Sequence, residues 1–305
     1  MISYTIKRLM QNIIVVIGVL LIAFTLVRLS GDPISVLLPP EASFEDIQRL
    51  RAQLGFDRPI YVQFYIFLSS AIQGDLGYSF LYHRPALTVV LSRVPATLQL
   101  TTLSICISLV IALPLGVIAA LRRDSWVDRF CMSLSLFGQS MPTFWFGIVL
   151  ILIFSILLGW FPAFGRGSIR HLILPSVTLG FYNAAITTRL LRSSLLEVLN
   201  KDYIRTAYAK GLAFRIVLFR HAIKNASLPV ITMLGLQFGH LMGGAIVTET
   251  VFAYPGLGNL AISSIYMRDF PVVQAFVVVI ALIIASVNLL VDILYAILDP
   301  RIKYK

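Results

Sequence analysis

The four histidines and two cysteines are the residues of this sequence best suited to metal binding or nucleophilic catalysis. Their spacings match no zinc or redox motif, and no Ser-His-Asp or Cys-His grouping is expected on one face. The sequence also lacks GxxxxGK(S/T), the loop that cradles nucleotide phosphates. We therefore expect no metal site, no catalytic residue and no ATP hydrolysis by this chain. The six residues are His83, His171, His221, His240, Cys106 and Cys131.

Polar side chains inside apolar runs form a second group with chemical potential. Such groups are costly in a bilayer and often line a solute path, although a hydrogen bond between helices explains any one of them more simply. Glu249 follows an apolar run, where it would contact a ligand amine, a partner protein or water. The path candidates are Gln139, Ser140, Asn183, Gln237, His240, Asn288 and Glu249.

The composition indicates where these residues must lie. The 305 residues are 58% hydrophobic and 13% charged, with a mean hydropathy of +0.88. These values exclude a disordered chain, a collagen, a coiled coil and an ordinary soluble enzyme, and they predict a polytopic membrane protein. The net charge of +11 would suggest nucleic-acid binding in a soluble protein. In a membrane protein it indicates basic cytoplasmic segments, so no nucleic acid is expected.

Six charge-poor apolar stretches are long enough to cross a bilayer, which needs about 20 residues per helix. With the N-terminus inside, inner segments hold 16 Lys and Arg and outer segments hold 9. Both termini are therefore predicted to be cytoplasmic. The first stretch is longer than a signal peptide core and lacks a good cleavage site, so we interpret it as a retained helix. The predicted spans are near 9–29, 97–121, 131–158, 172–196, 226–248 and 272–297.

Residues 30–94 form the only sizeable outer segment of this arrangement. Ser43 followed by two acidic residues predicts a helix start, and Gly55 suits its end. A charge-free run over 59–74 is rich in aromatic residues but short for a span, so an interfacial helix is the better prediction. The segment is too small for an enzyme domain, which leaves a lid or docking element and a membrane-surface spacer as alternatives.

The inner loop over 197–229 has the most informative pattern. Asn200 is a candidate helix cap and Asp202 suits a first turn. Small residues follow, and then Gly211 permits a sharp change of direction before a second helix. A short helix of this kind can enter a groove on another protein, with basic residues reaching acidic partners. The alternative is a basic loop lying on anionic lipid.

Residues 202–211 read DYIRTAYAKG and resemble the coupling loop of ABC importer permeases, specifically the dipeptide, oligopeptide, glutathione and nickel group. The general loop pattern begins with Glu-Ala-Ala, whereas Arg205, Thr206 and Ala207 occupy those places here, so a contact made by that glutamate does not carry over. Further landmarks of the group occur in order along nearly the whole chain, at 31–33, 74–77, 95–98, 249–252, 255–258, 268–272 and 299–301.

The resemblance implies an all-α membrane protein with six transmembrane helices in the type I ABC importer permease fold. It implies a multi-pass protein of the bacterial inner membrane, a second and different permease subunit, two ATP-binding subunits that bind ATP and Mg²⁺, and an extracytoplasmic solute-binding protein. The implied divisions are a first helix at 1–29, a periplasmic insertion at 30–94, a core at 95–297 with its coupling loop at 197–225, and a cytoplasmic tail at 298–305.

The resemblance also implies which residues dock on the ATPase and what the complex carries. The cargo would be a small peptide-like solute: a dipeptide, an oligopeptide, glutathione or a nickel chelate. A secondary transporter, a membrane enzyme and a scaffold subunit are the alternatives, but we find no internal repeat and no charge in the middle of a span. The docking residues would be Asp202, Tyr203, Arg205, Thr206, Ala207, Ala209, Lys210 and Gly211.

Overall fold

The computed structural model describes residue 10 and residues 14–25, 43–53, 55 and 57–298. These residues form helices and connecting turns, with one isolated antiparallel bridge between Tyr78 and Pro85. The chain divides into two compact units, and each is described by itself. Unit 1 comprises 1–95, 256–285 and 304–305, and unit 2 comprises 96–255 and 286–303.

Two long helices, α5 (Ala86–Leu121) and α14 (Phe270–Leu298), contribute residues to both units. The other helices of unit 1 are Ile14–Thr25, α3 (Phe44–Gln53), α4 (Ile60–Ile72) and α13 (Leu257–Tyr266). Unit 2 contains α6 (Trp126–Ser140), α7 (Thr143–Leu150), η1 (Ile151–Leu157), α8 (Ile169–Leu199), α9 (Asp202–Ala209), α10 (Phe214–Ile216), η2 (Val217–Ile223), α11 (Lys224–Gly244) and α12 (Ile246–Val251). The η segments are wide π-type turns continuous with their neighbouring helices.

In unit 1 the structure confirms the predicted helix start and stop of the outer segment. The Ser43 hydroxyl accepts a hydrogen bond from the Asp46 amide at 3.2 Å, and Gly55 has a φ of +71°. The aromatic run forms α4, and none of its residues is buried within the chain. A helix with this exposed apolar surface fits the predicted interfacial position, which stays a prediction.

A buried carboxylate organises the second part of unit 1. Asp269 is fully buried and accepts a hydrogen bond from the Ser79 hydroxyl at 2.5 Å. It also accepts from the backbone amides of Phe80 and Leu81. Because a buried charge is tolerated only when it is hydrogen-bonded, Asp269 fixes the loop after α4 against the start of α14.

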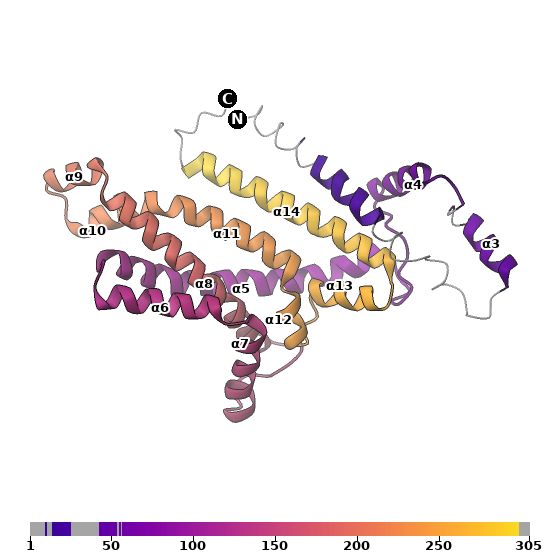
Figure 1. Ribbon diagram of the computed structural model, residues 1–305, viewed down its shortest axis with the longest axis horizontal. Coiled ribbons are helices and arrows are strands. Elements are labelled where there is room, and N and C mark those ends of the chain that lie inside the picture. Colours follow the sequence, from indigo (N-terminus) through magenta and orange to yellow (C-terminus); the bar gives the residue numbers. More distant parts are fainter. Residues whose placement is uncertain (1–9, 11–13, 26–42, 54, 56, 299–305) are drawn as a thin grey trace. The chain divides into compact units, whose positions relative to one another are not determined.

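Unit 2 is built around α8 and α11, with α6 packed along α8 (Figure 1). One apolar cluster surrounds the α7 and α12 region and includes Leu174, Leu241 and Phe252. A second lies at the other end of α8, around Leu191 and Leu195. Gly180 lets α8 approach α5 closely, because a Cβ there would lie 2.9 Å from the Ser104 carbonyl oxygen.

The structure corrects the predicted continuous span over 131–158. That stretch is divided into α6 and the α7–η1 pair, which are bent by 98°. Pro142 explains the break, because proline lacks an amide donor and drives the preceding residue out of the helical region. Met141 accordingly has an extended ψ of 129°. Pro229, in contrast, lies inside α11 and does not end it. Helix α11 begins at Lys224, two residues before the predicted span near 226–248.

Among the described residues, two helices are long and apolar enough to cross a membrane, α5 and the 270–293 part of α14. The bent pair would provide a third if it were one span. The first predicted span, 9–29, lies partly outside the described residues. The six-span arrangement and the positions of the termini stay predictions.

Gly235, one of four glycines on α11, packs closely against Val291 of α14 in the same chain. A Cβ at this position would lie 2.2 Å from Val291 on α14, so only glycine fits there. At Gly235, close packing therefore serves the fold of this chain.

Candidate functional site

The segment after α8 forms the short helix α9, as the sequence predicts, but its cap differs. Asn200 does not begin α9; it ends α8, where its side-chain amide donates to the Leu196 carbonyl oxygen at 3.0 Å. Its φ and ψ of −87° and −3° are helical, whereas an N-cap needs extended backbone. Lys201, with a ψ of 147°, takes that position. Asp202 lies in the first turn, as predicted.

Helix α9 has one buried face and one exposed face. Ile204 and Ala207, three residues apart, are buried in the cluster that includes Leu191, Leu195 and Val217. Because residues at this spacing share a face, this face seats α9 on η2, in an apolar cluster that it shares with α8. Of the predicted docking residues, Ala207 therefore packs inward. The exposed ones are Asp202, Tyr203, Arg205, Thr206, Ala209, Lys210 and Gly211.

The turn after α9 depends on Gly211. Its φ is +76°, and its amide donates to the Tyr208 carbonyl oxygen at 2.9 Å. A Cβ at Gly211 would meet no atom within 4 Å, so backbone conformation alone demands glycine here. The change of direction predicted at this residue is confirmed.

Polar contacts around α9 are mostly exposed. Lys201 pairs with Glu197 at 2.9 Å, and Arg205 pairs with Asp202 at 3.5 Å. Exposed pairs of this kind contribute little to stability. Partial burial raises the pKa of the Tyr203 phenol above its ordinary value, while the neighbouring Asn225 side chain lowers it. The Asn225 side-chain amide itself donates to the His221 carbonyl oxygen at 2.7 Å. Tyr203 of α9 therefore lies near the start of α11.

An ion pair that the sequence analysis missed joins α6 to α8. Arg192 donates two hydrogen bonds to Asp128, each 2.6 Å long. The Asp128 side chain is 5% exposed and the Arg192 side chain 23% exposed. Charge-assisted bidentate pairs are strong and directional. The one local signal is Ser125, whose hydroxyl caps α6 by accepting from the Asp128 amide; nothing in the sequence points to Arg192.

The broken helix opens a cavity of about 380 Å³ with both polar and apolar lining residues, which we call the broken-helix cavity. Four predicted path residues line it: Gln139, Ser140, Asn183 and His240. They come from α6, α8 and α11, so the fold gathers residues that are far apart in the sequence. The remaining lining residues are Met141, Pro142, Thr143, Leu179, Tyr182, Leu241, Ala245, Val247 and Thr248.

Three path candidates do not line this cavity. Gln237 is buried beside Thr187, with a side-chain contact of 3.4 Å. Glu249 is fully buried and accepts a hydrogen bond from the Thr97 hydroxyl at 2.7 Å. The water-facing alternative for Glu249 is therefore wrong, because buried bonding replaces its hydration. Asn288 is exposed on α14.

Sequence reasoning missed several polar groups at the cavity. Tyr182, Thr143 and Thr248 line it, and Arg189 donates to the Gln139 side-chain oxygen at 2.8 Å. Arg189 follows Asn183 by six residues on α8, which is about a third of a turn away around the helix, so helical spacing does not link them. Thr143 and Thr248 become recognisable only once the helix break is known.

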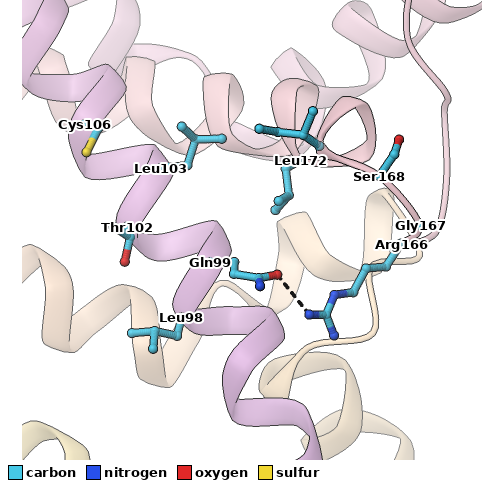
Figure 2. Close-up of a pocket in the computed structure, with 10 residues that line it drawn as sticks. Leu98, Gln99, Thr102, Leu103, Cys106, Arg166, Gly167, Ser168 and Leu172 are labelled. Atoms are coloured by element: carbon cyan, nitrogen blue, oxygen red, sulfur yellow. Dashed lines mark hydrogen bonds between the residues drawn. The ribbon is translucent and has the colours of Figure 1, made fainter.

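A second groove, of about 760 Å³, lies between α5 and the segment leading into α8. Figure 2 shows the Gln99 side chain on α5 pointing toward Arg166 of this segment. Arg166 donates to the Gln99 side-chain oxygen at 2.9 Å. The lining of this groove is mainly apolar. Within the described part of the chain, no three His, Cys, Asp or Glu residues are grouped to hold a metal ion.

Comparison with known proteins places these features in a family. Residues 112–304 match the family described as "Binding-protein-dependent transport system inner membrane component", and residues 1–101 match its N-terminal companion. Glutathione transport system permease protein GsiC of Escherichia coli O6:H1 (strain CFT073) is 45% identical over the whole of both chains. The GsiC protein of E. coli strain K12 is 44% identical over the same extent.

Solved structures agree with this at the level of the fold. An inward-facing structure of the MetNI methionine ABC transporter matches with a TM-score of 0.60 and 18% sequence identity. The match covers 70% of this chain and 98% of that chain.

Proposed function

Because this chain belongs to the family of binding-protein-dependent transport system inner membrane components, the permeases of ABC importers, we propose that it carries a small peptide-like solute into the cell. Glutathione is the first candidate, since relatives that match over their full length are named glutathione permeases. We propose that this chain binds no cofactor and that ATP and Mg²⁺ bind to its partners.

The proposed complex contains this chain, a second and different permease, two ATP-binding subunits and an extracytoplasmic solute-binding protein. The chain would cross the bacterial inner membrane six times, with both termini in the cytoplasm. The long apolar helices α5 and α14 support membrane insertion. The excess of basic residues in the predicted inner segments supports the orientation.

The observation that carries this proposal is the seating of α9. Ile204 and Ala207 pack into the chain's own apolar cluster, while Tyr203 and Tyr208 are each 44% exposed. A helix that is packed on one side and presents aromatic side chains on the other suits recognition by a groove. It lies beyond the ends of α8 and α11, where a partner can reach it (Figure 1).

A mechanism follows from the helices that α9 contacts. ATP binding would bring the two ATPase subunits together and displace α9 as a rigid body. The packing of α9 on η2, which itself contacts α8 and α11, together with the apolar cluster that α9 shares with α8, would pass this displacement to α8 and α11. Both helices also line the broken-helix cavity. The movement would therefore change which side of the membrane this cavity faces.

Reconstitution tests the proposal. The chain would be purified in mild detergent with the proteins that accompany it and placed in proteoliposomes with the binding protein and labelled reduced glutathione. We expect stoichiometric co-purification of a second permease and ATPase subunits, and uptake that requires ATP and Mg²⁺. A complex with catalytically inactive ATPases is the matched control. A chain that purifies without an ATPase, or takes up solute without ATP, would contradict the proposal.

A further inference from the structure

The broken-helix cavity contains the start of a helix with free donors. Helix α7 begins at Thr143 after the cap residue Pro142, and both line the cavity. Pro142 provides no side-chain cap. The first amides of a helix have no acceptor within it, and the helix dipole makes this end positive. Half-helices inside membranes present such ends to anionic groups of transported solutes.

A second and independent donor lies at the same cavity. Thr248 is 2% exposed and lines the cavity. Among the hydrogen bonds of the described residues, none involves the Thr248 hydroxyl, whereas the Thr250 hydroxyl on the same helix donates to the Ile246 carbonyl oxygen. A hydroxyl of a cavity-lining residue without a protein partner can donate to a ligand oxygen.

The charges around the cavity favour an anion. None of the lining residues is acidic, and His240 adds a further nitrogen donor. Arg189 lies beside the cavity, bonded to the lining residue Gln139. Glu249 is adjacent to Thr248 in sequence, but its carboxylate accepts from Thr97 and does not line the cavity.

We propose that the broken-helix cavity binds a carboxylate of the solute, between the first amides of α7 and the Thr248 hydroxyl, with Arg189 providing the neighbouring positive charge. This inference rests on the proposed function and narrows its solute class to peptides with a free carboxylate. Cationic solutes are disfavoured because no lining group would neutralise them.

Two matched pairs of variants separate this role from a general effect on folding. Thr248→Val removes the hydroxyl at constant shape, and Thr188→Val is its control, because Thr188 is also buried and unpartnered but does not line the cavity. Arg189→Gln removes the charge. Arg170→Gln is its control, since Arg170 is exposed on the same helix and also does not line the cavity.

The experiment measures binding to the purified complex in nanodiscs, without the binding protein, by saturation-transfer NMR. The probes are reduced glutathione and the same peptide with both of its carboxylates converted to amides. We expect the wild-type complex to favour the acid by about tenfold, as for one charge-assisted hydrogen bond. Thr248→Val and Arg189→Gln should reduce this preference to about twofold or less, whereas Thr188→Val and Arg170→Gln should retain it.

Equal binding of the two probes to the wild type, no binding of either, or an unchanged preference in both cavity variants would overturn the inference. If ATP-driven uptake of glutathione persists in those cases, the proposed function stands and only the carboxylate site is wrong. If ATP-driven uptake is itself absent, the proposed function fails, whatever the binding result.

Discussion

The two ends of the α8–α11 pair are built in opposite ways. At the α9 end, an apolar cluster surrounds Leu191 and Leu195, and the Asp128–Arg192 pair ties α6 to α8. At the other end, α6 is followed by α7 after a 98° bend, and the broken-helix cavity replaces close packing. Closely packed interiors transmit displacement because they do not deform continuously, whereas a helix break lets its parts move separately.

This difference in packing suggests a different role for each of the two regions. The α9 end is suited to move as a rigid body, without a change in its internal packing, when a partner displaces α9. The broken-helix cavity is suited to change shape, because the backbone ladder between α6 and α7 is already interrupted at Pro142. Substitutions at the α9 end should therefore lower stability or coupling, while substitutions at the cavity should alter solute preference.

The largest effect is expected from breaking the Asp128–Arg192 pair. Arg192→Ala leaves the buried Asp128 carboxylate without its counter-charge and should lower the free energy of unfolding by about 3 kcal/mol. Thermal unfolding in detergent measures this loss. Arg170→Ala, an exposed arginine on the same helix, should unfold like the wild type. The double variant Asp128→Leu with Arg192→Leu should recover most of the loss, and failure to recover would mean that the pair does more than neutralise buried charge.

The next effect separates the two faces of α9. Ile204→Ala removes a side chain that is 2% exposed and should cost about 2–4 kcal/mol of unfolding free energy. Tyr208→Ala removes an exposed ring and should change it by less than about 0.5 kcal/mol. In the reconstituted complex, however, Tyr208→Ala should reduce solute-stimulated ATP hydrolysis. Normal stimulation in Tyr208→Ala, with an intact complex, would contradict docking through this face.

Sequence reasoning predicted the features set by local pattern. Composition and apolar stretches predict a helical membrane protein, and the described residues form helices and connecting turns. Ser43 and Gly55 were identified as helix signals because a cap and a left-handed turn depend on one or two residues. Gly211 was found in the same way.

The remaining features depend on contacts between distant residues. Gln139, Ser140, Asn183 and His240 were chosen singly, and only the packing of three helices brings them to one cavity. The break at Pro142 was missed because hydropathy averages over proline, which changes direction without changing apolarity. Asn200 was assigned to the wrong helix because asparagine serves at either end of a helix.

Gly211 gives a third and smaller test of the α9 end. Gly211→Ala should cost about 1 kcal/mol through its φ of +76° alone, since no atom opposes the added Cβ. Gly211→Pro cannot adopt this φ and also loses the amide that bonds Tyr208. We expect it to insert normally but to abolish coupled uptake, measured as glutathione transport per ATP hydrolysed. Gly211→Asn, which tolerates the left-handed region, should retain coupling; its loss would show that more than backbone conformation is required.

The smallest effect concerns Tyr203, which is predicted to dock on a partner and also lies near the Asn225 side chain. Tyr203→Phe keeps the ring and removes the hydroxyl, so the unfolding free energy should fall by less than about 1 kcal/mol, because the residue is 44% exposed. Asn225→Ala removes the neighbouring polar side chain of α11. If this polar contact carries motion from α9 to α11, both variants should lower uptake per ATP hydrolysed to the same extent while leaving the ATPase attached. If Tyr203 acts only by docking, Asn225→Ala should transport normally, and transmission would then run through the apolar seat of α9 alone.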